Sequence, residues 1–462
     1  MLDIKLLRDD PQSLALNLAC RNVVVFDDLT ADVPDWAART VARLVELDTT
    51  WRTFISAVED IRRRQNANSE ASKAVSKLPK EQQAEARAPL LDEGRALRDA
   101  EREQTAAAVL AEVARDEAWV RLPNLTHVET PRGNTDEEHR VVREVGVRRD
   151  FAAEGFAPLD HVELCERLGL ADFSAGAKVA GPKFYYLKND AVRLDLALQQ
   201  YALAVASRHG FVLHTTPDLA KVEILAGLGF NPRGASTQVY SVADTDLCLV
   251  GTAEITLGGM LADEILEEEQ LPLLIAGLSH CFRTEAGAAG RDARGLYRVH
   301  QFTKVELFAF TVGDLAVSEA MHSRFLAIEE EIFSGLGIPY RVLDIASGDL
   351  GGPAFRKFDL EAWMPGRSAT PGAGSGAWGE VTSTSNCTDY QARRLRIRYR
   401  PRDADGNKGK KNRFVHMLNG TAIANTRAIV AILENYQQAD GSVIVPEALR
   451  TWVGKDRILA AG

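Results

Sequence analysis

The first hundred or so residues carry a helical pattern of apolar positions. From Leu44 to Ile61 the apolar residues recur at alternating spacings of three and four, which is typical of a coiled-coil seam. A second stretch, from about Glu81 to Trp119, places leucine and valine among many Ala, Glu and Arg residues. Because Pro79 between the two stretches is a turn signal, the pattern predicts a long antiparallel helical hairpin.

A change of composition marks the end of this hairpin. The segment LPNLTHVETPRGNTDEEH, which starts at Leu122, is rich in Pro, Gly and Asn and is typical of a linker. We therefore expect an N-terminal domain over residues 1–120 and a second domain over residues 121–462.

The second domain mixes short alternating segments with helical ones. Strands are expected at Lys183–Leu187 and Cys248–Val250, and helices at Ala191–Arg208 and Val317–Gly335. These elements do not follow a regular strand–helix–strand rhythm, so we expect a predominantly antiparallel sheet with flanking helices. The predicted fold class is α+β.

Composition indicates the domain count of the protein and the cellular compartment in which we expect it. The 462 residues are enough for two or more domains with full cores, and they contain no run of eighteen apolar residues and no secretory signal pattern. The five cysteines are scattered and form no C-x-x-C, which is typical of reduced thiols. We therefore expect a cytoplasmic protein with no membrane association.

Charge is distributed unevenly. The net charge of -10 counts against a nucleic-acid partner unless positive charge is concentrated locally. Around the expected turn of the hairpin, one acidic residue, Glu70, stands among six basic residues. These are Arg62, Arg63, Arg64, Lys73, Lys77 and Lys80. Such a basic tip can contact a phosphate backbone. By itself the pattern slightly favours the alternative, a dimerisation coiled coil with a solvated, charged tip.

The segment Phe282–Glu306 carries the main candidate chemistry. Two alternating stretches flank a Gly/Arg-rich turn, GAAGRDARG, which predicts an antiparallel strand pair. Residues an even number apart on a strand point to one face, so four side chains would share a surface. These are Arg283, Glu285, Phe302 and Glu306. A guanidinium that clamps phosphate, a carboxylate that accepts from an amine and a phenyl ring that stacks on a base suit a nucleoside triphosphate. The alternative is a charged hairpin that faces solvent.

This segment resembles motif 2 of class II aminoacyl-tRNA synthetases, in the form found in seryl-tRNA synthetases. TTPDLAKVEIL around Pro217 resembles motif 1, GTAEI around Thr252 resembles the serine-binding loop, and LNGTAIANTRAIVAILENYQ from Leu418 resembles motif 3. GDLGGPAFRKFDLEAWMPG and SNCTDYQARRLRIRYR also fall in the family's order. With the opening MLDIKLLRDDP, the resemblance covers nearly the whole chain.

The resemblance implies a class II catalytic domain preceded by a helical arm that holds the long variable arm of serine tRNA. It implies an ATP-dependent serine:tRNA ligase that forms seryl-adenylate from L-serine and transfers serine to the 3′ end of serine tRNA. The sequence leaves open whether selenocysteine tRNA is a further acceptor. The resemblance also implies a homodimer with motif 1 at the interface. Two alternatives are a non-catalytic tRNA-binding paralogue and an enzyme that loads serine onto a biosynthetic carrier. The intact motif residues argue against the first, and the basic arm argues against the second.

The resemblance also implies an ATP site with Mg²⁺. Arg283 would hold the α-phosphate and the attacking carboxylate, Glu380 would hold the metal, and Arg427 would cover the adenine and reach the γ-phosphate. These three are the implied catalytic residues. The implied ATP-binding residues are Arg283, Thr284, Glu285, Val299, His300, Gln301, Phe302, Glu380, Val381, Thr382, Ser383 and Arg427.

The implied serine pocket must bind an ammonium, a carboxylate and one hydroxyl. Thr252 and Glu254 suit the ammonium, and Glu306 with its neighbours suits the hydroxyl. The implied serine-binding residues are Thr252, Ala253, Glu254, Arg283, Glu306, Asn419 and Thr421.

The chain departs from the family pattern at several points. Val381 and Thr382 stand where Ile and Ser are frequent, and Ala422 and Ala424 replace glycines of the generic motif 3. The segment Gly366–Trp378 is longer than the usual connection, and its Gly, Ser, Pro and Ala content predicts a flexible surface loop.

Overall fold

The computed structural model describes residues 1–230, 238–285, 295–367, 376–403 and 405–459. The chain divides into two compact units, Met1–Leu125 and Thr126–Gly462. The predicted domains, 1–120 and 121–462, are defined by function and stay a prediction. Among the described residues, no helix combines the length and the apolar character needed to cross a membrane.

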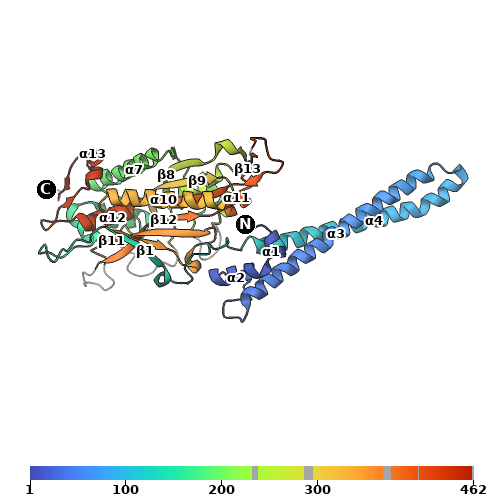
Figure 1. Ribbon diagram of the computed structural model, residues 1–462, viewed down its shortest axis with the longest axis horizontal. Coiled ribbons are helices and arrows are strands. Elements are labelled where there is room, and N and C mark those ends of the chain that lie inside the picture. The colour runs from blue at the N-terminus through green and yellow to red at the C-terminus, as the bar shows by residue number, and fades with distance from the viewer. Residues whose placement is uncertain (231–237, 286–294, 368–375, 404, 460–462) are drawn as a thin grey trace. The chain divides into compact units, whose positions relative to one another are not determined.

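The first unit is helical, with α1 (Lys5–Asp9), α2 (Pro11–Arg21), α3 (Trp36–Val75) and α4 (Lys80–Trp119). Helices α3 and α4 each span 40 residues and pack against each other as a hairpin (Figure 1), which confirms the predicted arm. The seam buries Leu44 and Val58 of α3 and Leu97 and Ala108 of α4.

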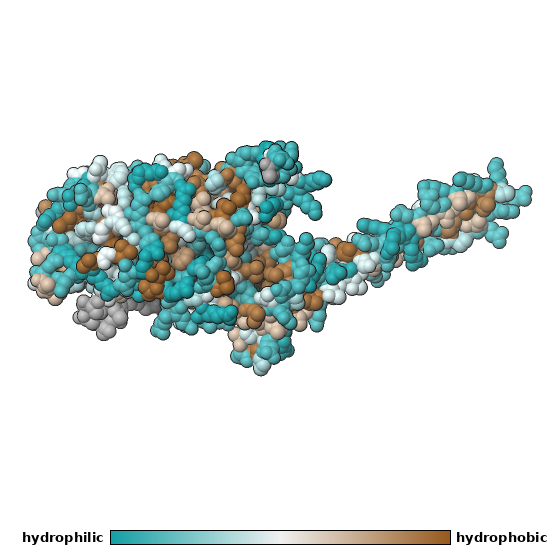
Figure 2. Space-filling model, in the orientation of Figure 1, coloured by the Kyte–Doolittle hydropathy of each residue, from teal (hydrophilic) through white to brown (hydrophobic). Residues whose placement is uncertain are grey.

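The surface of the arm is largely hydrophilic (Figure 2). Each helix of a two-helix arm buries one stripe, so its remaining faces carry polar residues that meet solvent. Some apolar side chains stay exposed between them, including Leu91 and Leu110 of α4.

The second unit is built on an eight-stranded sheet. In spatial order its strands are β1 (Arg140–Val145), β10 (Tyr340–Asp344), β11 (Arg356–Met364), β12 (Ala377–Asn386), β15 (His416–Ala424), β9 (Gln301–Thr311), β8 (Leu273–Phe282) and β4 (Val212–Thr215). Neighbouring strands are antiparallel except for β4 and β8, which are parallel. The predicted antiparallel sheet with flanking helices is therefore confirmed.

The two faces of the sheet pack against different helices. On β9, Val305, Leu307 and Ala309 join the larger core with α7 (Asp190–Arg208), α10 (Leu315–Gly335) and α12 (Asn425–Tyr436). The alternate residues Phe308 and Phe310 join a second core with α8 (Val222–Leu228), α9 (Ala253–Gly259) and α11 (Tyr390–Leu395). Successive strand residues point to opposite faces. We call the face of Phe308 and Phe310 the site face and the other the back face.

The remaining elements are short. They are α5 (His161–Leu168), α6 (Phe173–Ala180), α13 (Arg450–Val453), β2 (Ala171–Asp172), β3 (Tyr186–Leu187), β5 (Leu219–Lys221), β6 (Leu247–Leu249), β7 (Ile265–Glu267), β13 (Arg398–Arg400), β14 (Arg413–Phe414), β16 (Val443–Ile444) and β17 (Arg457–Ile458). The strand expected at Lys183–Leu187 is thus shorter than predicted. Lys183 has a φ of 65°, a left-handed conformation that cannot continue an extended strand.

Candidate active site

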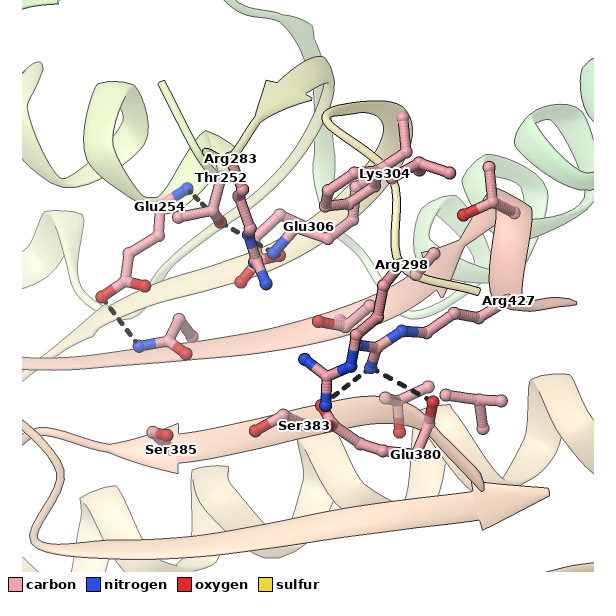
Figure 3. Close-up of a pocket in the computed structure, with 18 of the residues that line it drawn as sticks. Thr252, Glu254, Arg283, Arg298, Lys304, Glu306, Glu380, Ser383, Ser385 and Arg427 are labelled. Carbon is pink, nitrogen blue, oxygen red and sulfur yellow. Dashed lines mark hydrogen bonds and ion pairs between the residues drawn. The ribbon is translucent and has the colours of Figure 1, made fainter. Parts of the chain in front are cut away.

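A cavity of about 240 Å³ opens on the site face (Figure 3). It is lined by nine of the residues predicted to bind ATP, namely Arg283, Glu285, Val299, Phe302, Glu380, Val381, Thr382, Ser383 and Arg427. It is also lined by six residues predicted to bind serine, namely Thr252, Glu254, Arg283, Glu306, Asn419 and Thr421. Residues separated by up to 197 positions in the sequence therefore meet in one place, since Phe230 and Arg427 both line it.

Strand β9 supplies one wall of the cavity. Phe302, Lys304 and Glu306 are alternate residues of this strand, and all three line the cavity. They have the same parity as Phe308 and Phe310, so the pleat places them on the site face. Glu306 lies opposite Thr421 of β15, which brings two predicted serine-binding residues together.

A bulge in β12 sets which of its side chains face the cavity. Leu360 pairs with Thr382 and Glu361 pairs with Glu380, so Val381 is an extra residue between the two pairs. The extra residue of such a bulge interrupts the alternation of side chains between the two faces of the sheet. Consequently Glu380 and Ser383 lie on the same side even though they are three residues apart (Figure 3).

At one end of the cavity, Arg427 of α12 binds Glu380. Arg427 Nη1 lies 3.1 Å from Glu380 Oε1 and donates to the Glu380 backbone carbonyl at 3.1 Å. Burial opposes ionisation of Glu380, but the nearby charges of Arg427, Lys357 and Arg283 outweigh burial and lower its pKa to about 2. Tyr297 packs beside this pair, with the Arg427 guanidinium 4.9 Å from the ring centroid. This end holds an ionised carboxylate among cations, as a polyphosphate site requires.

At the other end, Lys304 connects Thr252 and Glu306. Its ammonium donates to Thr252 Oγ1 at 2.7 Å and forms an ion pair with Glu306. Thr252 is also the N-cap of α9, because its hydroxyl accepts from the backbone N–H of Glu254. Burial raises the pKa of Glu306, and the charge of Lys304 opposes that shift.

Glu254 is also buried at this end. Its Oε1 accepts from Gln391 Nε2 at 2.7 Å and from Asn419 Nδ2 at 3.1 Å. Burial and the nearby charge of Glu306 raise the pKa of Glu254 to about 7. Acceptor oxygens in a buried, acidic environment suit an ammonium group.

Arg283 and Glu285 follow strand β8, which ends at Phe282, so the expectation that both lie on the strand itself was wrong. The Arg283 backbone N–H still donates to His300 O at 3.0 Å, which extends the pairing by one residue. Glu285 has a φ of 48°, which turns the chain away from the strand direction. The Arg283 guanidinium lies 5.2 Å from the Phe302 ring centroid and donates to Gly251 O at 3.2 Å.

Four predicted site residues do not line the cavity: Ala253, Thr284, His300 and Gln301. Ala253 is buried in the second core. His300 stacks on Phe184 with ring centroids 5.2 Å apart. Gln301 is exposed. Gln301 lies next to the lining residue Phe302 on β9, where the pleat turns every second side chain away. Ala253 is the first residue of α9, and Thr284 and His300 lie outside the strands.

The structure adds nine lining residues that were not predicted. Four of them are Tyr297, Arg298, Lys304 and Lys357, and the others are Phe230, Leu350, Ser385, Ala424 and Thr426. Lys304 shares the parity of Phe302 and Glu306, so strand alternation could have identified it. Lys357 of β11 pairs with Asp359 at 3.2 Å and faces Glu380, and only the order of strands in the sheet brings it there.

The basic residues of the arm are partly neutralised. Arg62 contacts Glu101 at 2.8 Å and Arg64 contacts Glu93 at 3.3 Å, both across the hairpin. Lys73 contacts Glu70 at 2.6 Å, and Arg63 pairs with Asp60 of its own helix. Counting charge along α3 alone therefore overstated the positive excess, because α4 supplies acidic partners.

The turn of the arm lies at the far end of the predicted tip region, next to Pro79. Helix α3 continues to Val75, and the connection to α4 covers residues 76–79. Arg64 therefore lies about 16 Å before the end of α3, at about 1.5 Å per residue. Lys77 and Lys80 are the predicted basic residues nearest the turn.

One further group of possible metal ligands lies elsewhere among the described residues, at Asp136, His139 and Asp349. His139 Nδ1 accepts from the Ala346 backbone N–H at 3.2 Å. In the neutral ring the hydrogen is then on Nε2, which faces Asp349 at 3.4 Å as a donor and not as a metal ligand.

Two predicted loops cannot be compared with the structure over most of their length. Residues 286–294, which include most of the turn GAAGRDARG, lie outside the described residues. Residues 368–375, the centre of Gly366–Trp378, also lie outside them.

Comparison with known proteins places this geometry in a family. The seryl-tRNA synthetase N-terminal domain matches residues 1–126, and the tRNA synthetase class II core domain (G, H, P, S and T) matches residues 239–436. The serine–tRNA ligase of Treponema denticola is 48% identical to this chain, covering 99% of the chain and 100% of the relative. That of Rhodopirellula baltica is 49% identical and covers 99% of each.

A solved structure agrees with the sequence relatives. The crystal structure of seryl-tRNA synthetase from Pyrococcus horikoshii complexed with ATP matches with a TM-score of 0.86 and 37% identity, covering 100% of both chains. With the same fold and close relatives along almost its entire length, the chain belongs to the seryl-tRNA synthetase family.

Proposed function

We propose that this chain is an ATP-dependent serine:tRNA ligase. It activates L-serine as seryl-adenylate and transfers the seryl group to the 3′ end of serine tRNA. The observation that carries this function is the cavity itself, in which the Arg427–Glu380 pair at one end and the Glu254, Glu306 and Lys304 group at the other lie on one face of the sheet. The first end suits a triphosphate and the second a small zwitterion.

The first reaction joins serine to AMP. An oxygen of the serine carboxylate attacks the α-phosphorus of ATP, the bond to the bridging oxygen breaks, and pyrophosphate leaves. The nucleophile is already an anion, so the site needs positioning and charge neutralisation more than a general base. Arg283 lies between the two ends of the cavity and is our candidate to bind the α-phosphate and the serine carboxylate (Figure 3).

Each end of the cavity would bind one part of the reactants. Arg427 would contact the γ-phosphate and one adenine face, and Phe302 with Val299 would contact the other face. Glu285 would accept from the adenine amine. Glu254 and Thr252 would bind the serine ammonium, and Glu306 would bind its hydroxyl. In the second reaction the terminal tRNA hydroxyl attacks the activated carbonyl and AMP leaves.

The site also fits Mg²⁺. Glu380 is an ionised carboxylate that lines the cavity, and Ser383 supplies a hydroxyl oxygen beside it. Hard cations prefer such oxygen ligands and need few from the protein when phosphates supply the rest. Bound there, the ion would neutralise charge on the phosphates. Glu380 and Ser383 are the residues that we propose to hold it.

Partners and location extend the proposal. We propose a homodimer, which the exposed Val212 and Leu213 on the edge strand β4 support, since this strand precedes the motif 1 match. The arm would hold serine tRNA, and selenocysteine tRNA is a further candidate acceptor. Five free cysteines, four of them buried, support a reducing compartment such as the cytoplasm.

Serine-dependent ATP–pyrophosphate exchange followed by tRNA charging tests the function. A serine:tRNA ligase catalyses both. Exchange without charging of tRNA would instead indicate an enzyme that loads serine onto another carrier, and tRNA binding without exchange would indicate a non-catalytic paralogue.

A further inference from the structure

Helix α10 contacts the back of β12 through a row of buried polar side chains, which we call the α10–β12 ladder. On α10 its members are Ser318, His322 and Glu329, which the helical repeat places on one face. The ladder consists of three contacts: Asn386 Nδ2 donates to Ser318 Oγ at 3.2 Å, His322 Nε2 meets the Thr384 carbonyl at 3.0 Å, and Thr382 Oγ1 donates to Glu329 Oε2 at 2.7 Å.

Glu329 is the unusual member of this ladder. It is fully buried, and no ion pair to it occurs among the described residues. Its second oxygen, Oε1, has no hydrogen-bond partner within the described part of the chain. A buried carboxylate without a cation is very costly, so the group is held as the neutral acid. Consistent with this, burial raises the pKa of Glu329 well above its usual value.

The sheet makes room for this carboxyl group. Gly420 of β15 lies against Glu329 Oε1, and a Cβ at position 420 would come within 2.9 Å of that oxygen. Any other residue at position 420 would require this carboxyl oxygen to shift. Glu329 and Gly420 therefore fit each other at the point where α10 crosses the sheet.

The partner of Glu329 adjoins the bulge of β12. Thr382 is the residue directly after Val381, the extra residue of the bulge. The Thr382 hydroxyl binds Glu329 of α10, and Thr382 also lines the cavity beside Ser383 and Glu380. Shifting a strand by one residue moves each of its side chains to the opposite face of the sheet. A hydrogen bond that holds the Thr382 hydroxyl toward α10 therefore also holds the Glu380 side chain on the site face.

We propose that Glu329 is a positioning residue for the ATP end of the site: by accepting the hydrogen bond of Thr382 it holds the β12 bulge that directs Glu380 toward Arg427. Glu329 does not touch the reactants. The inference rests on the proposed function, in particular on the role of Glu380 and Ser383 at the phosphates.

The test compares two variants that break the contact with two that keep it. Glu329→Leu removes the acceptor and is the deciding variant, because Glu329 does not line the cavity, whereas Thr382 does. Thr382→Val removes the donor with little change of shape. Glu329→Gln keeps a neutral acceptor of the same size. Ser318→Ala breaks the far end of the same ladder, next to Asn386, and serves as the matched control for lost stability.

Kinetics of ATP–pyrophosphate exchange are measured with ATP and serine varied separately. We expect Glu329→Leu and Thr382→Val to lower kcat/KM for ATP by about tenfold, the effect of losing a buried hydrogen bond, and to leave the KM for serine within about twofold. Glu329→Gln stays within about twofold of wild type at every pH from 6 to 9. Ser318→Ala loses thermal stability without a change in the KM for ATP. Calorimetric titration with ATP alone repeats the comparison without turnover.

Several results would overturn the inference. One is an unchanged affinity for ATP in folded Glu329→Leu and Thr382→Val. Another is an equal loss for ATP and serine, which would indicate general damage to the sheet. A pH profile altered in Glu329→Gln would mean that the residue acts through charge. Failure of the proposed function is distinct, because the wild-type chain would then show no serine-dependent exchange while ATP titration would still report on Glu329.

Discussion

Lys304 and Glu306, two residues apart on β9, form a buried ion pair that faces the serine end of the cavity. Glu306 is predicted to bind the serine hydroxyl, and Lys304 balances the charge of its carboxylate. The ammonium of Lys304 also holds Thr252 at 2.7 Å. The hydroxyl of serine would therefore meet a carboxylate whose negative charge Lys304 already balances.

This pair leads to the first prediction. Glu306→Ala should lose most serine activation and narrow the ratio of kcat/KM for serine to that for alanine. A pocket that hydrogen-bonds a substrate hydroxyl can reject the analogue without it by about 10⁴-fold, and this penalty disappears with the carboxylate. Lys304→Met should lose serine activation as well, because it leaves Glu306 buried without its cation. Exchange kinetics with both amino acids measure the ratio. A ratio unchanged in Glu306→Ala would show that this carboxylate does not read the hydroxyl.

The second prediction concerns pH. Burial and the charge of Glu306 raise the pKa of Glu254 to about 7, above the unfolded value of 4.5. The carboxylate needed for the serine ammonium is then lost as pH falls through 7, so the KM for serine should rise by up to about tenfold per pH unit below that value. The free energy of unfolding changes with pH in the opposite direction to serine binding. A raised pKa favours the folded state at low pH, so the free enzyme loses this contribution as pH rises from about 4.5 to 7.

Profiles of kcat/KM for serine from pH 5.5 to 8.5, with thermal unfolding at the same pH values, check both signs. Glu254→Gln is the control, because it cannot ionise. The kcat/KM of this variant should be lower and should not change with pH near 7. If its kcat/KM still fell below pH 7, the titrating group would be a residue other than Glu254.

The third prediction concerns Arg283. Arg283→Ala should lower kcat/KM in exchange by an amount equivalent to about 3 to 4 kcal/mol, comparable to the loss of one preorganised donor in a transition state. Arg298 lines the same cavity and forms an ion pair with Glu285 at 3.7 Å, and it has no assigned contact with the α-phosphate. Arg298→Ala is therefore a matched charge control with a smaller expected loss. Near-normal exchange by Arg283→Ala would remove it from the proposed mechanism.

The alternation of residues within a single strand predicted the site residues that this strand supplies. The alternation of β9 places Phe302 and Glu306 on one face, and the same alternation would have included Lys304. The facing of Glu380 depends instead on the bulge opposite β11, and its partner Arg427 lies 47 residues later. Pairing between segments that are distant in the sequence sets such registers, so periodicity along one segment could not identify Glu380 and Arg427. The resemblance to the family's motifs identified them.

The arm shows the same distinction. Apolar spacing in each helix predicted the hairpin, because a coiled-coil seam is a local pattern. The ion pairs Arg62–Glu101 and Arg64–Glu93 depend on how the two helices align along their length, which the spacing leaves open. Counting the charges of one helix alone therefore overestimated the positive charge on the surface of the folded hairpin.

The fourth prediction separates activation from tRNA recognition. Replacing residues 44–113 by a short Gly/Ser linker should leave serine-dependent exchange largely intact, since no residue that lines the cavity lies there. Charging of tRNA should collapse. If the shortened protein charged tRNA normally, the arm would have no role beyond structure.

The last prediction tests whether the position of positive charge on the arm matters. The double variant Arg62→Glu with Glu101→Arg keeps the ion pair across the hairpin and the net charge but moves the cation from α3 to α4. If Arg62 contacts a tRNA phosphate, this exchange should raise the KM for tRNA and reduce the slope of log affinity against log salt by about 1, because one fewer counterion is released on binding. Helix content, thermal stability and serine-dependent exchange should match wild type, since the pair and the cavity are kept. The same exchange at Arg102 and Asp99, an ion pair within α4, provides a control of equal charge. Equal tRNA affinity and salt dependence in the Arg62 exchange and this control would show that the arm contributes a general field and that Arg62 makes no specific contact.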